Sequence, residues 1–151
     1  MSRACLMCAE VCGDVVVPGG HLEDGELVTA FHSPIVEPAT DVFVGYLFVT
    51  ARRHVPGFAD LTVEEAAAVG VSIARWSRAL EAAGADHVYV LRVGLRAPHL
   101  HVHLVPRWAE TPDDVPWMHV DDWPGARRGA MEQAAELVSD LRRLDVQGPS
   151  S

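Results

Sequence analysis

The hydrophobic pattern along the chain separates two helical stretches from several short β-rich runs. From Val63 to Ala83, apolar residues recur at three- and four-residue steps, which predicts one long amphipathic helix. Thr62 and Glu65 form a Thr-x-x-Glu capping box at its start, and Gly84 is a natural stop. A second apolar stripe predicts a C-terminal helix over roughly Met131 to Leu144.

The remaining apolar runs are rich in β-formers. Val15 to Val17 and Glu26 to Phe31, with Gly and Pro turn signals between them, predict a β-hairpin. We expect three further strands, over Val42 to Val49, His87 to Val93, and Leu100 to Val105, the last closed by Pro106. Together these elements predict an α+β fold, mainly an antiparallel sheet of about five strands with one long helix and a C-terminal helix.

A length of 151 residues suits a single domain. We expect its core over about residues 5–107, followed over 108–151 by a tryptophan-rich loop and the C-terminal helix. The loop carries Trp108, Trp117 and Trp123 among prolines and acidic residues, with no sustained period. It could cover a site, supply a stacking ring or only pack a dimer, and packing is the commonest role of tryptophan.

Composition narrows the class of protein. Hydrophobic residues make up 49% and charged residues 22%, as in soluble globular proteins, and the formal net charge of −9 argues against a general nucleic-acid binder. No apolar run approaches the roughly 20 residues that cross a bilayer, and the first residues lack a secretory pattern. Three cysteines near one end do not form a disulfide framework, so we expect a cytoplasmic protein.

Three histidines alternate with aliphatic residues in the last predicted strand. His99, His101 and His103 would face one side of the sheet, because successive side chains on a strand point to opposite faces. Imidazole is a nucleophile and a proton carrier near neutral pH. The alternatives are hydrogen-bonded core histidines and a metal site made of these three residues alone. Separately, the Cys5-x-x-Cys8 pair indicates metal binding, redox chemistry or a chance spacing.

The segment from His99 to Val105 resembles the His-φ-His-φ-His-φ-φ signature (φ, hydrophobic) of the histidine triad (HIT) superfamily of nucleotide hydrolases and transferases. Two other segments are similar to that family. Gly45 to His54 resembles its glycine-led strand that ends in a basic pair and a histidine, and Asp60 to Glu65 resembles the start of its long helix. With the cysteine pair, the resemblance covers about Cys5 to Arg107.

The resemblance implies a mechanism that acts on a nucleotide derivative. His101 would attack the α-phosphorus and form a nucleotidyl-histidine intermediate, which water or another acceptor would then resolve. His103 would contact phosphate oxygens or the leaving group. The backbone or side chain of His99 would orient His101 and leave one of its nitrogens free.

In the zinc-bearing branch of the family, a Cys-x-x-Cys pair joins two histidines in one metal site. Carried over to this chain, the ligands are Cys5, Cys8, His54 and His99, a Cys2His2 set. Four protein ligands leave no open coordination position, so the implied role of zinc is structural. The alternative role for the cysteine pair is a thioredoxin-type redox site. Such a site requires the pair to lie at a strand-to-helix junction.

Two segments depart from the family pattern. Many members hold the ribose with an aspartate after the second strand, where this chain has His32 and Ser33; these two residues, or Asp41 from the following loop, are the candidates to replace it. The turn before the triad is short and lacks the usual amide and hydroxyl pair. Arg96 is either a phosphate-binding fork in their place or a solvated turn residue.

We therefore expect a HIT-like enzyme that cleaves or transfers a nucleoside monophosphate group, without nucleic-acid polymers or membranes as partners. Two alternatives belong to other classes: a nucleotide-binding HIT-like module with little catalysis, and a zinc-stabilised interaction protein. The resemblance further implies a homodimer.

Overall fold

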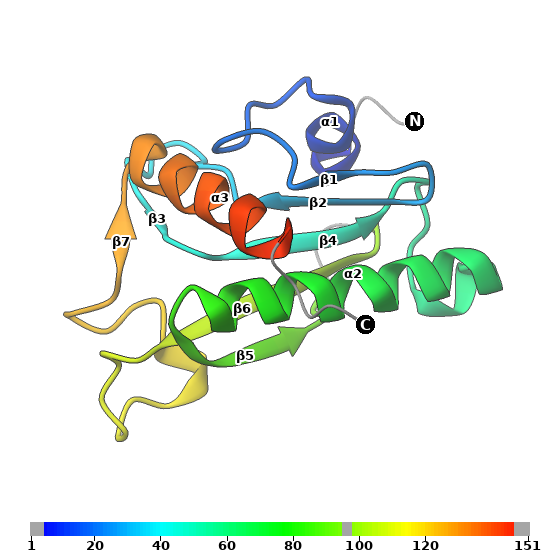
Figure 1. Ribbon diagram of the computed structural model, residues 1–151. Coiled ribbons are helices and arrows are strands. Elements are labelled where there is room, and N and C mark those ends of the chain that lie inside the picture. Colours follow the sequence, from blue (N-terminus) through cyan, green and yellow to red (C-terminus); the bar gives the residue numbers. More distant parts are fainter. Residues whose placement is uncertain (1–4, 95–97, 147–151) are drawn as a thin grey trace.

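A five-stranded antiparallel sheet forms the centre of the protein, in the strand order β1-β2-β4-β6-β5 (Figure 1). The computed structural model describes residues 5–94 and 98–146. The strands are β1 (Glu23–Asp24), β2 (Val28–His32), β4 (Leu47–Ala51), β5 (Ala85–Leu91) and β6 (His101–Trp108), and β3 (Val42–Phe43) pairs separately with β7 (Arg128–Gly129). The helices are α1 (Leu6–Cys12), α2 (Val63–Ala82) and α3 (Met131–Val146), with 3₁₀ turns at η1 (Phe58–Asp60) and η2 (Trp117–His119). This arrangement confirms the predicted α+β class.

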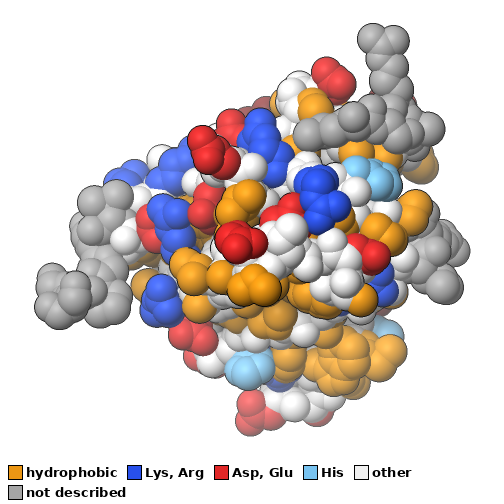
Figure 2. All heavy atoms as spheres, turned by 90° about the vertical axis from the view of Figure 1, so that its right-hand side faces the viewer, with side chains coloured by type: hydrophobic (Ala, Val, Ile, Leu, Met, Phe, Trp, Pro, Cys, Tyr) orange, Lys and Arg blue, Asp and Glu red, His pale blue; other side chains and the backbone are white. Residues whose placement is uncertain are grey.

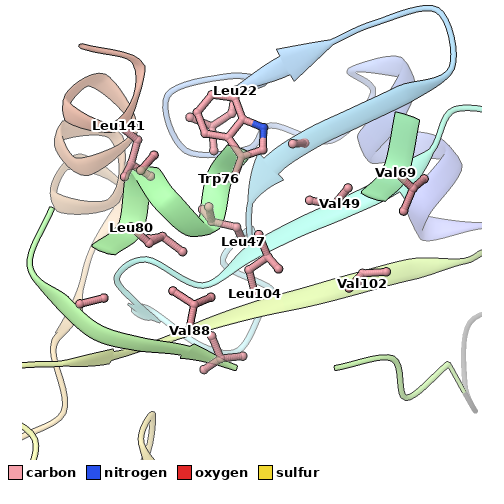
Figure 3. Packing of buried hydrophobic residues seen from close by; sticks show 14 of the residues in the cluster. Leu22, Leu47, Val49, Val69, Trp76, Leu80, Val88, Val102, Leu104 and Leu141 are labelled. Atoms are coloured by element: carbon pink, nitrogen blue, oxygen red, sulfur yellow. The ribbon is translucent and has the colours of Figure 1, made fainter. Parts of the chain in front are cut away.

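One face of the sheet is covered by α2, with α3 packed beside it (Figure 1). Figure 3 shows Trp76 and Leu80 of α2 among Val49, Val102 and Leu104 of the sheet. All five side chains are at most 1% exposed. The hydrophobic core therefore lies between α2 and one face of β4 and β6, as the periodicity of the sequence predicted.

The opposite face of the sheet carries the histidines. In the strand register, Phe48 of β4 pairs with His103, and Thr50 pairs with His101. Since cross-strand partners point to the same side, these four side chains share the face that α2 does not cover. Part of this face is closed by α1, whose Met7 packs with Phe31 and Phe48 in a second, smaller cluster.

The capping box predicted for α2 is present and is reinforced by an ion pair. The Thr62 hydroxyl accepts from the Glu65 amide at 3.2 Å, and the Glu65 carboxylate accepts from the Thr62 amide at 2.9 Å. The Arg53 guanidinium donates to both Glu65 oxygens, at 2.7 and 2.8 Å. The hydrogen bonds from Arg53 and from the Thr62 amide lower the pKa of Glu65 to about 2.

The N-terminal region differs from the prediction. Val15 to Val17 is not a strand, and the hairpin is instead formed by β1 and β2. The helix α1 was not expected from the pattern. It has only seven residues, too few to be stable alone, and it forms because Met7 and Val11 are buried against the sheet.

Two predicted strand boundaries were also wrong. The run from Val42 to Val49 is broken at Gly45, which has a φ of +101° and lies so close to Trp108 that a Cβ would meet its ring at 2.5 Å. Pro106 does not close β6, which continues to Trp108. The pairing of β6 with β4 ends at Leu104, so Pro106 lies where β6 is paired on one side only, where a missing N–H is tolerated.

The tryptophan-rich segment is packed against the domain only in part. Trp108 is buried, its indole N–H donates to the Val44 carbonyl at 3.0 Å, and the Arg127 guanidinium stacks 4.0 Å from its ring. Trp117, in contrast, is 49% exposed. Packing in the core therefore explains Trp108, whereas Trp117 lies at the surface.

The visible surface has no broad basic face. In Figure 2, which shows the right-hand end of Figure 1, basic and acidic side chains are interspersed among hydrophobic ones. Within residues 5–94 and 98–146, none of the helices combines the length and hydrophobicity that crossing a bilayer requires.

Candidate metal and histidine site

Four residues from three parts of the chain converge at one end of the sheet. Cys5 and Cys8 come from the start of α1, His54 follows β4, and His99 precedes β6. One ligand atom from each residue lies within 4.8 Å of the others. The Cys8 Sγ is 3.1 Å from His54 Nδ1 and 3.4 Å from His99 Nδ1, and Cys5 Sγ is 3.7 Å from His99 Nδ1. The structure thus assembles the Cys2His2 set that the resemblance implied.

The ring of His99 is oriented for metal binding. Its Nε2 lies 3.0 Å from the Ala51 carbonyl oxygen, which can only accept, so Nε2 carries the proton and the Nδ1 lone pair faces the cysteines. Burial lowers the pKa of His99, which also favours the neutral, ligating form. Two thiol groups and two imidazoles are the donor set of tetrahedral structural zinc sites, and these residues fit that ion.

The local structure explains how a terminal segment reaches the sheet. Cys5 is the N-cap of α1 and Cys8 lies three residues later, so both side chains point to the same side of the helix. Met7 and Val11 are buried in a cluster with Phe31 and Phe48, which holds α1 against the sheet. Among the described residues, every strand follows α1 in the chain, so no strand-to-helix junction is seen at the cysteine pair, and the thioredoxin-type arrangement is not favoured.

His101 is held in one tautomer by the backbone of His99. The His101 Nδ1 donates to the His99 carbonyl oxygen at 2.7 Å, and the ring is 8% exposed. Because a carbonyl only accepts, Nδ1 carries a proton, and in the neutral form of the ring Nε2 is the nitrogen with the lone pair. Next to it, the Thr50 hydroxyl donates to the Leu100 carbonyl at 2.7 Å and holds this part of the chain against β4.

His103 lies beside His101, with 4.9 Å between the ring centroids. Its Nδ1 is 2.9 Å from the Tyr46 hydroxyl, and its Nε2 is buried without a protein hydrogen-bond partner. Burial, assisted by the neighbouring His101, lowers the pKa of His103 to about 4, so the ring is neutral at pH 7. The Phe48 ring meets both histidines edge-on, with centroid distances of 5.6 and 5.0 Å.

The other predicted ligand-binding residues are not all brought to this site. His32 is fully buried, its Nδ1 donates to the Ser33 carbonyl at 2.8 Å, and its Nε2 accepts from the Gly45 amide at 2.9 Å. Both ring nitrogens are thus used within the protein, which leaves none for a ribose. The Asp41 carboxylate is paired with Arg128 at 2.8 Å. Arg96 lies outside the described residues.

Sequence reasoning assigned no role to Tyr46 or Phe48. Both lie in a run that the pattern identified only as buried strand. Their contacts with the histidines follow from the pairing of β4 with β6, in which Phe48 lies opposite His103. Only the strand register, which the hydrophobic pattern does not reveal between two buried strands, could have identified them.

No protein-family model and no curated protein sequence matches the chain. Solved structures do match it. A Zn-bound histidine triad family protein from Mycobacterium smegmatis superposes with a TM-score of 0.72 at 21% identity, over 97% of this chain and 99% of that one. A hypothetical histidine triad nucleotide-binding protein from Sulfolobus tokodaii gives 0.67 at 19% identity, over 95% and 92%. A histidine triad protein from Bradyrhizobium japonicum gives 0.63 at 24% identity, over 89% and 93%.

These structures share the chain's fold over almost their whole length. In this chain the alternating histidines run from His99, just before β6, to His103 within it. The chain has the fold of the histidine triad superfamily.

Proposed function

We propose that the protein is a nucleotide hydrolase or nucleotidyltransferase that acts at the α-phosphate of a nucleotide derivative, with His101 as the nucleophile. The observation that carries this proposal is the hydrogen bond from His101 Nδ1 to the His99 carbonyl. It directs the Nδ1–H to the backbone and leaves Nε2 as the ring nitrogen that can attack phosphorus, on a residue that is 8% exposed.

The reaction would proceed in two displacements. The His101 Nε2 lone pair forms a bond to the α-phosphorus while the bond to the leaving group breaks, and the leaving group takes that electron pair. Positive charge then develops on the imidazole ring, and the His99 carbonyl stabilises it through the Nδ1–H bond. Water, or another acceptor, attacks the same phosphorus from the opposite side, releases the nucleoside monophosphate group and restores His101.

His103 is suited to contact the phosphate. With Tyr46 donating to Nδ1, the proton of the neutral ring lies on Nε2, the nitrogen that has no protein partner. A neutral N–H next to the nucleophile can donate to a non-bridging phosphate oxygen, where negative charge concentrates in the transition state. We further propose that Ser33 contacts the ribose and that Arg96 contacts the phosphate.

A zinc ion in the Cys2His2 cluster would have a structural role. Bound to Cys5, Cys8, His54 and His99, it would fix α1 to the sheet and hold the segment that carries the His99 carbonyl. We extend the proposal to a cytoplasmic homodimer, which light scattering coupled to size-exclusion chromatography would test.

The test is turnover by His101→Asn in a screen of adenosine and guanosine monophosphate derivatives. We expect wild-type protein to release the nucleoside monophosphate and His101→Asn to lose at least about a thousandfold in rate, since the covalent route is removed. His87→Asn, at an exposed histidine on β5, is the matched control and should retain full activity. Undiminished turnover by His101→Asn would rule the mechanism out. Nucleotide binding without turnover by wild type would instead favour the binding-module alternative.

A further inference from the structure

A small cleft lies beside the histidine row, at its far end from the cysteines. Its volume is about 90 Å³, large enough for one ring or a short alkyl group. We call it the Trp117 cleft. Its walls come from β5, β6, the residue before β4 and the tryptophan-rich segment. The lining residues are Tyr46, Tyr89, Leu91, Val105, Trp117, Met118 and Asp121.

Two contacts connect the Trp117 cleft to His103. Tyr46 lines the cleft, and its hydroxyl is 2.9 Å from His103 Nδ1. Leu91 also lines it and is the direct cross-strand partner of His103 in the pairing of β5 with β6. A group attached to a phosphate that contacts His103 would therefore have this cleft next to it.

The walls of the Trp117 cleft are aromatic and partly open to solvent. Tyr89 and Trp117 are in ring contact, with 6.2 Å between their centroids. Trp117 is 49% exposed and Met118 is 63% exposed, which is unusual for side chains that cost free energy in water. Aromatic faces that remain accessible can stack on a ring or contact a cation.

Among the described residues that line the cleft, Asp121 is the one charged side chain, and none of the others is a lysine or arginine. Burial raises the pKa of Tyr46, and the negative charge of Asp121 raises it further, so the carboxylate lies near the Tyr46 phenol. A carboxylate among three aromatic side chains attracts an organic cation and repels a phosphate-rich group.

The segment that carries these residues is held in place. Val120 is 1% exposed, and the Arg128 guanidinium donates to the Asp121 carbonyl at 3.0 Å while it pairs with Asp41. The backbone of η2 is closed by a hydrogen bond from the His119 amide to the Pro116 carbonyl at 2.9 Å. The Trp117 cleft is therefore pre-formed, and binding there would not require this segment to fold first.

We infer that the Trp117 cleft is a specificity subsite for a small organic ammonium group carried by the substrate. The inference rests on the proposed function, which places the phosphate at His101 and His103. It predicts that nucleotide derivatives with a cationic organic substituent are preferred over those with a polyphosphate substituent.

Binding of small probes tests the inference without any turnover. Benzylammonium, benzyl alcohol and benzoate share one ring and differ in charge, and the indole N–H signal of Trp117 in a two-dimensional NMR spectrum reports on each. We expect saturable shifts with benzylammonium, about tenfold weaker binding of benzyl alcohol, and no binding of benzoate. Asp121→Asn should weaken benzylammonium binding about fivefold or more and leave benzyl alcohol unchanged.

Asp122→Asn is the matched control, because Asp122 is adjacent but its carboxylate pairs with His119. It should change benzylammonium binding by less than about twofold. Trp117→Leu keeps an apolar side chain and should weaken both neutral and cationic probes. Equal binding of all three probes, no binding of any, or an unchanged affinity in Asp121→Asn would each overturn the inference.

The same data separate this inference from the proposed function. If benzylammonium binds as expected but no nucleotide derivative is turned over, the Trp117 cleft stands and the catalytic proposal fails. If His101 proves to be the nucleophile but Asp121→Asn has no effect on the probes, the catalytic proposal stands and the cleft has another role.

Discussion

His99 contributes to both halves of the site with different atoms. Its ring directs Nδ1 to the cysteines, whereas its carbonyl oxygen accepts the hydrogen bond that fixes the tautomer of His101. The three histidines of the signature are therefore not equivalent. In the proposed mechanism, His99 would orient His101 and bind the metal, His101 would attack, and His103 would donate a hydrogen bond to the phosphate.

Tyr46 is expected to set the tautomer of His103. In Tyr46→Phe the hydroxyl partner of Nδ1 is lost, so the proton should move in part from Nε2 to Nδ1. Nitrogen-15 chemical shifts of the ring report this directly, and turnover should fall by about two- to tenfold, as for the loss of one hydrogen bond. Tyr89→Phe removes another hydroxyl from the same cleft and should leave the ring shifts of His103 unchanged. An unchanged His103 ring in Tyr46→Phe would contradict the assignment.

His32 and Ser33, although adjacent, should respond differently to mutation. His32→Ala leaves the buried Gly45 amide without its acceptor and opens a cavity, so we expect a loss of about 2–4 kcal/mol in the free energy of unfolding. Ser33→Ala should stay within about 0.5 kcal/mol of wild type and weaken nucleotide binding. Urea denaturation and calorimetric titration with a nucleoside monophosphate make the comparison. A His32→Ala protein as stable as wild type would refute the structural role of His32.

At the level of elements, the strongest sequence signals specified the structure well and the weakest did not. The periodicity and capping box of α2 predicted its start at Val63 and its end within one residue. The helix α1 escaped notice because its stability comes from contacts with the sheet rather than from its own pattern. Similarly, only the tertiary contact with Trp108 explains the break at Gly45.

The residues of the candidate site also fall into two groups, those that the sequence identified and those that it did not. Cys5, Cys8, His54 and His99 were identified from a family resemblance, since nothing in their spacing along the chain shows that four distant residues meet. Tyr46 and Asp121 were not identified, because their positions depend on strand register and on the path of an irregular segment. Sequence patterns reveal a site best where its residues repeat at the period of one element.

Metal removal should act mainly through α1. A chelator, or Cys8→Ser, removes the link between this short helix and the sheet, and we expect the melting temperature to fall by about 5–10 °C. Elemental analysis should find one zinc ion per chain in the wild type and less in the mutant. Cys12→Ser, at the exposed end of α1, is the control and should retain zinc. An unchanged melting temperature after complete removal of zinc would show that the cluster does not support the fold.

For the whole molecule, buried neutral histidines should make stability depend on pH. Burial lowers the pKa of His103 to about 4, from an ordinary 6.5, and lowers the pKa of His32 as well. Between these values the unfolded chain binds protons that the folded chain does not, so this stabilisation is complete above about pH 6.5 and is lost as the pH falls toward 4.

Denaturation of wild type and His103→Asn at several pH values checks this expectation. Between pH 6.5 and 4, the free energy of unfolding should fall less steeply in the mutant than in the wild type, because Asn does not titrate. The difference in slope corresponds to at most one proton taken up on unfolding. The comparison of slopes cancels any loss of zinc that both proteins share. Parallel slopes would mean that His103 is not held neutral by the fold.

The central claim is that His101 Nε2 becomes covalently bonded to phosphorus. The most direct measurement is to mix the protein with a nucleotide derivative that it turns over and to quench the reaction within the first turnover. The quench uses alkaline denaturant, because alkaline conditions preserve phosphorus–nitrogen bonds. The modified peptide is then mapped by mass spectrometry. We predict one nucleoside monophosphoryl group on His101 in wild type and none in His101→Asn. Modification of another residue, or rapid turnover with no adduct at any quench time, would contradict the account.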